Sequence, residues 1–151
     1  MRLIAGKTVM ELGCGNGRFT KVASQSAKMV YGLDWARSNL FDDSFENVIF
    51  VQSDALKADF PKVDVACSGD VLEHFKPDDV PNLIQKLHES AEINFHVIAC
   101  YDDKHSHLTI QPKEWWLAQF QKLDPAYKLF NDGGEKRDIA IISNLVGAGG
   151  A

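Results

Sequence analysis

Short apolar runs alternate along the chain with stretches in which apolar residues recur every three or four positions. The short runs are typical of buried strands, and the recurring pattern is typical of amphipathic helices. Their alternation predicts βαβ units, whose strands pair in parallel. The runs that we expect to form strands are Thr8–Leu12, Met29–Asp34, Val48–Gln52, Val63–Ser68 and Ile93–Tyr101.

Helices are expected between and after these strands. One covers Arg18–Ser26 and places Phe19, Val22 and Ala23 on its apolar face, and another covers residues 112–123. The clearest helical pattern precedes the fifth strand. Its single apolar stripe is formed by Val80, Leu83, Ile84, Leu87 and Ala91.

The end of the chain has a different pattern. Two apolar runs, Tyr127–Asn131 and Asp138–Ser143, flank a short segment with two adjacent glycines, which predicts an antiparallel hairpin. The whole pattern therefore predicts an α/β fold with a doubly wound mixed sheet of seven strands and an antiparallel C-terminal hairpin. We expect residues 1–146 to form one domain and the glycine-rich residues 147–151 to form a flexible tail.

Length and charge narrow the classes of function. A chain of 151 residues is long enough for one domain, and its formal net charge is −5. Binding to phosphates needs a clustered basic face, so the acidic balance argues against nucleic acid as the main partner. No apolar stretch approaches the roughly 18 residues of a membrane span, and no apolar signal core follows the first residues. We therefore expect a cytoplasmic protein with no membrane partner.

The three cysteines do not indicate a metal site. Cys14, Cys67 and Cys100 lie far apart, without the spacing of metal ligands. We expect them to be reduced thiols that act as small buried apolar side chains, and we expect no metal.

The strongest chemical signal is the glycine-rich segment that follows the first strand. Closely spaced glycines between a strand and a helix let a ligand approach the backbone without meeting a Cβ atom. A dinucleotide-binding turn has glycine or alanine at the position of Arg18, and a carboxylate such as Glu11 does not favour a pyrophosphate. The negative charge of Glu11 suits a ligand that carries positive charge. A nicotinamide-dependent oxidoreductase is therefore a less favoured alternative.

The segment Glu11–Gly17 resembles the first motif of the class I S-adenosylmethionine-dependent methyltransferases. Further segments resemble later landmarks of that family in the same order. Tyr31–Asp34 is similar to the motif whose acidic residue takes the ribose hydroxyls, and Ser53–Ala55 to the motif that contacts adenine. Val71–Phe75 and residues 107–116 resemble segments found in subsets of the family.

This resemblance implies a Rossmann-like fold and S-adenosylmethionine as cofactor, with S-adenosylhomocysteine as product. It also implies that Trp35 lies against adenine. Three alternatives stay open, namely a solvated or capping role for Asp34, core packing for Trp35 and a helix N-cap for Asp54. The cofactor-binding residues implied are Glu11, Gly13, Cys14, Gly15, Gly17, Asp34, Trp35, Asp54, Ala55 and Asp70.

Methyl transfer from a sulfonium is an in-line displacement, so the protein mainly aligns donor and acceptor. A general base helps only where the acceptor must lose a proton. Four residues lie near the predicted carboxyl ends of the fourth and fifth strands, namely Asp70, His74, His105 and His107, and of these we favour His107 and His74. A surface histidine without a role is the simpler alternative, and Glu73 with His74 could instead cap and orient the next helix.

The acceptor is the least determined feature. Many enzymes that methylate exocyclic amines of nucleic acids carry an Asn/Asp-Pro-Pro-Tyr/Phe motif after the fourth strand. This chain has the sequence Ser-Gly-Asp-Val there, at residues 68–71. We therefore expect a small-molecule or glycan-type acceptor. The early first strand predicts an open cofactor site or one covered by a partner, and a homodimer is one such arrangement. Trp115 and Trp116 either pack a helix on the sheet or form an exposed aromatic surface. A non-catalytic S-adenosylmethionine-binding module or partner subunit is the alternative function.

Overall fold

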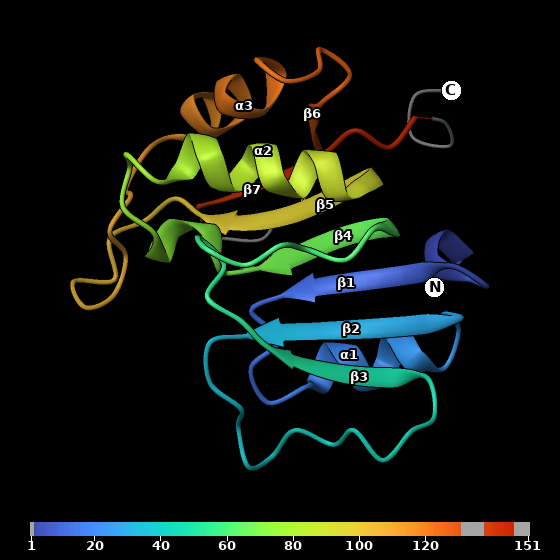
Figure 1. The fold of residues 1–151 in the computed structure, drawn as a ribbon. Helices are drawn as coiled ribbons and strands as arrows, with labels where there is room; N and C mark the ends of the chain where they lie inside the picture. The colour runs from blue at the N-terminus through green and yellow to red at the C-terminus, as the bar shows by residue number, and fades with distance from the viewer. Residues whose placement is uncertain (1, 131–137, 147–151) are drawn as a thin grey trace.

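The computed structural model describes residues 2–130 and 138–146. Its sheet has seven strands in the order β3-β2-β1-β4-β5-β7-β6 (Figure 1). β1 to β5 pair in parallel, and β7 runs antiparallel to both β5 and β6. The predicted mixed sheet with a C-terminal hairpin is therefore confirmed. The strands are β1 Thr8–Leu12, β2 Met29–Asp34, β3 Val48–Gln52, β4 Val63–Gly69, β5 Ala91–Ala99, β6 Lys128–Phe130 and β7 Ile139–Ser143.

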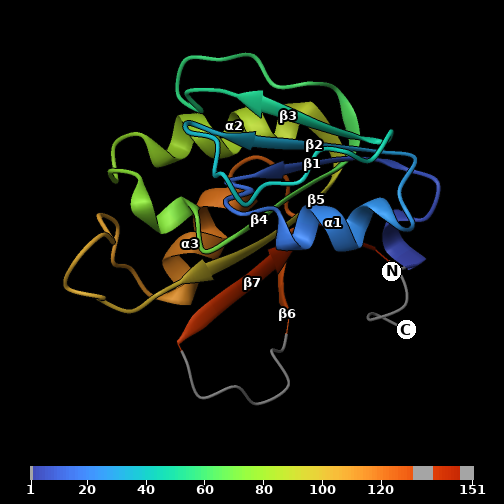
Figure 2. The same ribbon diagram turned by 90° about the horizontal axis from the view of Figure 1, so that it is seen from below.

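Helices cover both faces of the sheet, as a doubly wound fold requires. α1 (Arg18–Ser24) lies on one face, and α2 (Val80–Ser90) with α3 (Lys113–Gln121) lies on the other (Figures 1 and 2). Two short 3-10 turns, η1 (Arg2–Ile4) and η2 (Leu72–His74), complete the described elements. No helix in the described part of the chain has the length and apolar character needed to cross a bilayer. The glycine pair of the predicted hairpin turn and the predicted tail both lie outside the described residues.

The core consists of two layers because alternate side chains of a strand point to opposite faces. Val9 packs on the α1 side, in a cluster with Ala23. Its neighbour Met10 packs on the other side, in a larger cluster with Leu83 of α2 and Trp116 of α3. The strands β1 and β4 thus lie in the middle of the molecule, and their carboxyl ends are held in fixed positions.

The buried face of α1 differs from the predicted one. Phe19 and Val22 are 39% and 47% exposed, whereas Thr20 and Ala23 are buried. The small buried residues let the helix approach the sheet closely, and the bulkier side chains point outward. The helix also ends at Ser24 rather than Ser26.

The fifth strand begins earlier than the apolar pattern predicts. Ala91 has extended backbone angles and pairs with Val63, so it belongs to β5 and not to the stripe of α2. No loop separates helix from strand, and the strand ends at Ala99 instead of Tyr101. At α3, Trp116 is fully buried and Trp115 is partly buried, so this pair packs the helix on the sheet.

A buried polar chain links β4 and β5 beneath α3. The Nε2 atom of His96 lies 2.9 Å from Oδ1 of Asn94, and its Nδ1 atom lies 2.7 Å from the Ser68 hydroxyl. Because an amide oxygen only accepts, Nε2 carries the hydrogen and Nδ1 accepts from Ser68. The Asn94 amide also donates to the carbonyl of Ala91. Burial lowers the pKa of His96 to about 3, so this histidine is neutral in the folded protein. We call Ser68, His96 and Asn94 the core triad.

Candidate functional site

A cavity of about 690 Å³ opens at the carboxyl ends of β1 to β4. It contains seven of the residues predicted to bind cofactor or to assist catalysis. Ligands of open α/β sheets bind at this edge. The sequence motifs also contain Leu12, Ser53, Val71 and Phe75 of this wall, although none of these is predicted to bind cofactor, and Gln52 at the end of β3 lies outside the motifs. The lining is formed by Leu12, Gly13, Asp34, Trp35, Gln52, Ser53, Asp54, Ala55, Asp70, Val71, His74 and Phe75.

The glycine turn forms one wall of this cavity. At Gly13 the backbone has a φ of +72°, and a Cβ atom there would lie 2.3 Å from a methyl carbon of Val71. At Gly15, with a φ of +53°, an added Cβ atom would meet nothing within 4 Å. The first glycine therefore permits tight packing, whereas the second faces open space. Gly17 also has positive φ and precedes α1 directly; neither Gly15 nor Gly17 lines the cavity.

Asp34 connects the turn to the end of β2. Its Oδ2 atom accepts a hydrogen bond from the Gly15 amide at 2.9 Å, and its Oδ1 atom accepts one from the Trp35 amide at 2.8 Å. Each carboxylate oxygen keeps a further lone pair. Asp34 lines the cavity, so these lone pairs are available to hydroxyl donors on a ligand.

The next two predicted contacts lie beside Asp34. Trp35 is 78% exposed and lines the cavity, so core packing is excluded for it. Asp54 caps a short turn through Oδ1, which accepts from the Leu56 amide at 3.0 Å, and it lines the cavity as well. Asp54 therefore both caps the short turn and lines the cavity. The buried hydroxyl of Ser53 has no hydrogen-bond partner among the described residues.

Glu11 and Cys14 do not line the cavity. Glu11 points to the α1 side, where its carboxylate accepts a hydrogen bond of 2.5 Å from the Thr20 hydroxyl. Burial raises the pKa of Glu11 to about 7. Cys14 packs with Phe41 and Val48, and burial raises its pKa to about 12. The side chains of Glu11 and Cys14 therefore support the turn from behind.

Asp70 has a positive φ of 56°, which is uncommon for a residue with a side chain. Its amide donates to the carbonyl of Val97 at 3.0 Å, which ties the end of β4 to β5. Its exposed side chain lines the cavity, and the next residue, Val71, lies against Gly13 of the glycine turn. A strained backbone held in this way is typical of functional sites.

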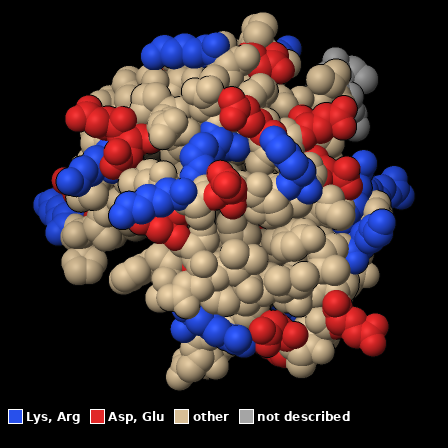
Figure 3. Space-filling view, in the orientation of Figure 1, with Lys and Arg blue, Asp and Glu red and all other residues tan. Residues whose placement is uncertain are grey.

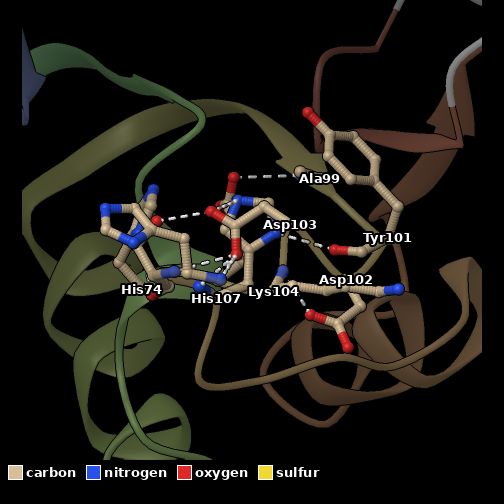
Figure 4. Close-up of polar contacts among 10 residues, drawn as sticks. His74, Ala99, Tyr101, Asp102, Asp103, Lys104 and His107 are labelled. Atoms are coloured by element: carbon tan, nitrogen blue, oxygen red, sulfur yellow. Dashed lines mark hydrogen bonds and ion pairs between the residues drawn. The ribbon is translucent and has the colours of Figure 1, made fainter.

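The two candidate histidines lie together, although only one lines the cavity. His74 comes from η2 and His107 from the loop after β5, and their ring centroids are 4.9 Å apart in an edge-to-face arrangement (Figure 4). His74 is exposed, whereas the side chain of His107 is only 6% exposed. Beside them, Glu73 is fully buried, and burial raises its pKa. The N-cap of α2 is Asp79, so neither Glu73 nor His74 caps that helix.

Asp103 shapes the loop that carries His107. Its Oδ1 atom accepts hydrogen bonds from the amides of His105, Ser106 and His107, and its Oδ2 atom accepts one from the Ser106 hydroxyl (Figure 4). These bonds hold the pKa of Asp103 well below its usual range. The permanent negative charge fixes the loop, and with it the position of His107.

Charged side chains are mixed over the face shown in Figure 3. Basic and acidic groups alternate there, and no broad region of that face carries basic groups alone. An extended phosphate backbone would require such a region.

The comparisons with known proteins agree on the methyltransferase domain. A family model described as a methyltransferase domain matches residues 2–131. Phosphoethanolamine N-methyltransferase 1 of Triticum aestivum is 33% identical over 93 residues, which covers 55% of this chain but only 19% of that protein.

Solved structures share the fold at low sequence identity. The 1,6-didemethyltoxoflavin-N1-methyltransferase of Burkholderia thailandensis, with bound 1,6-didemethyltoxoflavin and S-adenosylhomocysteine, superposes with a TM-score of 0.74 at 14% identity, over 92% of this chain and 70% of that one. The small RNA methyltransferase HEN1 superposes with a TM-score of 0.72 at 14% identity, over 94% of this chain and 23% of that one. Their names specify a small molecule and an RNA, so the fold alone does not identify an acceptor.

Proposed function

This chain belongs to the methyltransferase domain family, and we propose that it transfers a methyl group from S-adenosylmethionine to a small-molecule acceptor. The observation that carries the proposal is the cavity at the sheet edge, where Asp34, Trp35 and Asp54 follow the ends of β2 and β3 beside the glycine turn. S-adenosylmethionine, when bound, supplies an electrophilic methyl group on a sulfonium.

The donor groups present fit the parts of this cofactor. The free lone pairs of Asp34 suit a vicinal diol, because hydrogen bonds to a charged acceptor contribute about 1.5–3 kcal/mol each. The exposed indole of Trp35 offers a flat apolar surface for a purine. Asp54 and the unpartnered hydroxyl of Ser53 are the hydrogen-bonding groups beside that surface. Ala55 is buried at the wall and keeps it apolar.

The remaining residues act on the amino-acid end of the cofactor. Asp70 follows β4, which pairs with β1, and its exposed carboxylate in the cavity can attract a cation. Gly15 leaves room at the turn, Gly17 lets the turn pack against Phe41, and Glu11 with Cys14 holds that turn against α1 and the sheet. Glu11 therefore acts as a positioning residue.

A small acceptor, free or with a sugar, suits the surface. The cavity of about 690 Å³ has the size of a small-molecule site, and the cofactor proposed here occupies it. The mixed charges of Figure 3 and the net charge of −5 do not favour a polyanion.

Alignment and exclusion of water are the main contributions of this chain to the transfer. Where the acceptor is a hydroxyl, His74 is placed to take its proton, because it lines the cavity and is exposed. His107 is almost fully buried behind His74 and orients it through the contact between the rings.

The experiment is a transfer assay with S-adenosylmethionine labelled on its methyl group. Purified chain is incubated separately with amines, phenols, hydroxylated heterocycles, small sugars and total RNA, with Asp34→Ala as the inactive control. We expect label in a small molecule and none with Asp34→Ala. Label in RNA alone would contradict the acceptor class. Cofactor binding without transfer to any acceptor would identify a non-catalytic binding module.

A further inference from the structure

The cluster of Glu73, His74 and His107 has the composition of a metal site, although nothing in the cysteine spacing suggests one. One possible ligand atom from each residue lies within 4.8 Å of the other two. Among the described residues, this is the group of three histidine, cysteine or acidic side chains that lies so close together. η2 supplies Glu73 and His74, and the loop after β5 supplies His107. Figure 4 shows the two histidines beside one another.

The two imidazoles are fixed in the tautomer that a metal requires. Nδ1 of His74 lies 3.1 Å from the carbonyl oxygen of Ser106, and Nδ1 of His107 lies 2.7 Å from that of Tyr101. Because a carbonyl only accepts, both Nδ1 atoms carry hydrogen, and in the neutral rings both Nε2 atoms present a lone pair. Backbone carbonyls orient metal-bound histidines in this way. The nearest described carboxylate to Nε2 of His107 is Asp103, at 3.6 Å.

Glu73 supplies the independent observation. It is 0% exposed, and its Oε1 atom accepts a hydrogen bond from the Ala99 amide at 3.2 Å. Its Oε2 atom is buried and has no partner among the described residues. A buried carboxylate oxygen without a partner is unfavourable, and a cation would supply the partner.

The backbone already holds these ligands together. The carbonyl of Glu73 accepts hydrogen bonds from the amides of Leu108 at 2.9 Å and Thr109 at 3.1 Å. The Thr109 hydroxyl donates to the carbonyl of Phe75 at 2.6 Å. The loop with His107 is thus attached to both ends of the turn with Glu73 and His74, and the exposed ring of His74 has room to close on an ion.

We propose that Glu73, His74 and His107 bind one divalent transition-metal ion. Two imidazoles and one carboxylate favour ions such as Zn²⁺, Co²⁺, Mn²⁺ or Fe²⁺ over Mg²⁺ and Ca²⁺, which prefer oxygen ligands. Three protein ligands leave coordination positions open, and these face the cavity because His74 lines it. The role of the ion rests on the proposed function: it would bind the oxygen of a hydroxyl acceptor and lower the pKa of that hydroxyl, so that the proton passes to solvent water, because Nε2 of His74 is then a metal ligand and no longer a base.

The test is calorimetric titration of the metal-free full chain with Co²⁺, Zn²⁺ and Mg²⁺, with the visible absorption of Co²⁺ as a second signal. We expect one Co²⁺ or Zn²⁺ per chain and much weaker binding of Mg²⁺. Removal of a residue that only hydrogen-bonds to a metal ligand lowers metal affinity by about 10- to 100-fold. Because His107→Ala and His74→Ala remove ligands themselves, each should weaken binding by at least that factor. His105→Ala removes an exposed histidine of the same loop and should leave binding unchanged.

Equal affinity of all three variants for Co²⁺, or no binding by the unmodified chain, would overturn the proposal. Tighter binding of Mg²⁺ than of Co²⁺ would overturn the class of ion. Thermal unfolding of each variant separates loss of ligands from loss of fold, and His74→Ala is the variant least able to disturb the core because His74 is exposed. The metal titration contains neither cofactor nor acceptor. Absence of metal binding would therefore not count against the proposed methyl transfer, and absence of methyl transfer would not count against the metal site.

Discussion

Two histidine clusters differ in how their polar groups are paired: the core triad lies on β4 and β5, and the cluster of Glu73, His74 and His107 lies in η2 and the loop after β5. In the core triad, both ring nitrogens of His96 have a partner, and so do the Ser68 hydroxyl and the Asn94 amide. In the cluster at the sheet edge, Oε2 of Glu73 has no partner among the described residues, and Nε2 of His107 has none within hydrogen-bond distance. Both clusters are mostly buried, so burial alone does not distinguish them.

The difference shows how a structural polar cluster differs from a functional one. Buried polar groups that are fully paired add rigidity and specificity to a core. Buried groups left unpaired cost stability and persist where a ligand completes them. We therefore interpret the core triad as part of the fold and the cluster around Glu73 as part of the site.

The largest effect is expected from His96→Ala. The substitution removes a buried ring that stacks on Phe120, and it leaves the Ser68 hydroxyl and Oδ1 of Asn94 without the described partner that the ring supplied. We expect a loss of about 3–5 kcal/mol in the free energy of unfolding, measured by urea denaturation. His105→Ala, at an exposed histidine, should change it by less than about 0.5 kcal/mol. A comparable small change in both variants would refute the structural role of the core triad.

An intermediate effect is expected at Glu11, whose carboxylate has the Thr20 hydroxyl as its described partner. Burial raises the pKa of Glu11 from its ordinary value of 4.5 to about 7, so its stabilising contribution is fully present below pH 4.5 and is lost as the pH rises through 7. Relative to the unmodified chain, the neutral variant Glu11→Gln should therefore gain up to about 3 kcal/mol in the free energy of unfolding between about pH 4.5 and 7. Above pH 7 the difference between the two proteins should stay constant. Denaturation curves across this range measure the difference. A difference in the free energy of unfolding that does not vary with pH would contradict the raised pKa of Glu11.

The smallest effect on stability is expected from His74→Ala. His74 is exposed, so the free energy of unfolding should change by less than about 0.5 kcal/mol. Transfer to a hydroxyl acceptor should nevertheless fall by about 100-fold or more, because the variant loses its means of deprotonation. This loss is measured by comparing the steady-state rates of methyl transfer of His74→Ala and His105→Ala under conditions in which both variants are folded. Unchanged transfer by His74→Ala would remove the edge cluster from catalysis.

The sequence predicted the strands better than the helix faces. The bounds of β1, β2 and β3 agree with the apolar runs, because buried parallel strands are continuous apolar segments bounded by polar residues and glycine. In α1 the prediction for Ala23 is confirmed, but it is wrong for Phe19 and Val22, because the other buried position is taken by Thr20, whose small size serves close packing rather than hydrophobicity. Ala91 fits a helical stripe by spacing, and only its pairing with Val63 assigns it to β5.

The site was predictable where its residues follow strand ends in order. Asp34, Asp54 and Asp70 are such residues, and all three line the cavity. The tertiary pairs were not predictable. That Glu11 bonds to Thr20, and that the buried Glu73 lies beside His107, depends on which way alternate side chains point and on how a distant loop returns.

Titration of the purified chain with S-adenosylhomocysteine tests the central claim most directly. It is carried out beside Asp34→Ala and the control Asp78→Ala, which removes an exposed aspartate outside the cavity. We expect the unmodified chain and Asp78→Ala to bind with equal affinity. Asp34→Ala should bind at least about tenfold more weakly, because one charged hydrogen bond of about 1.5 kcal/mol already corresponds to that factor. Equal binding by all three proteins, or none by the unmodified chain, would contradict a cofactor site at this sheet edge.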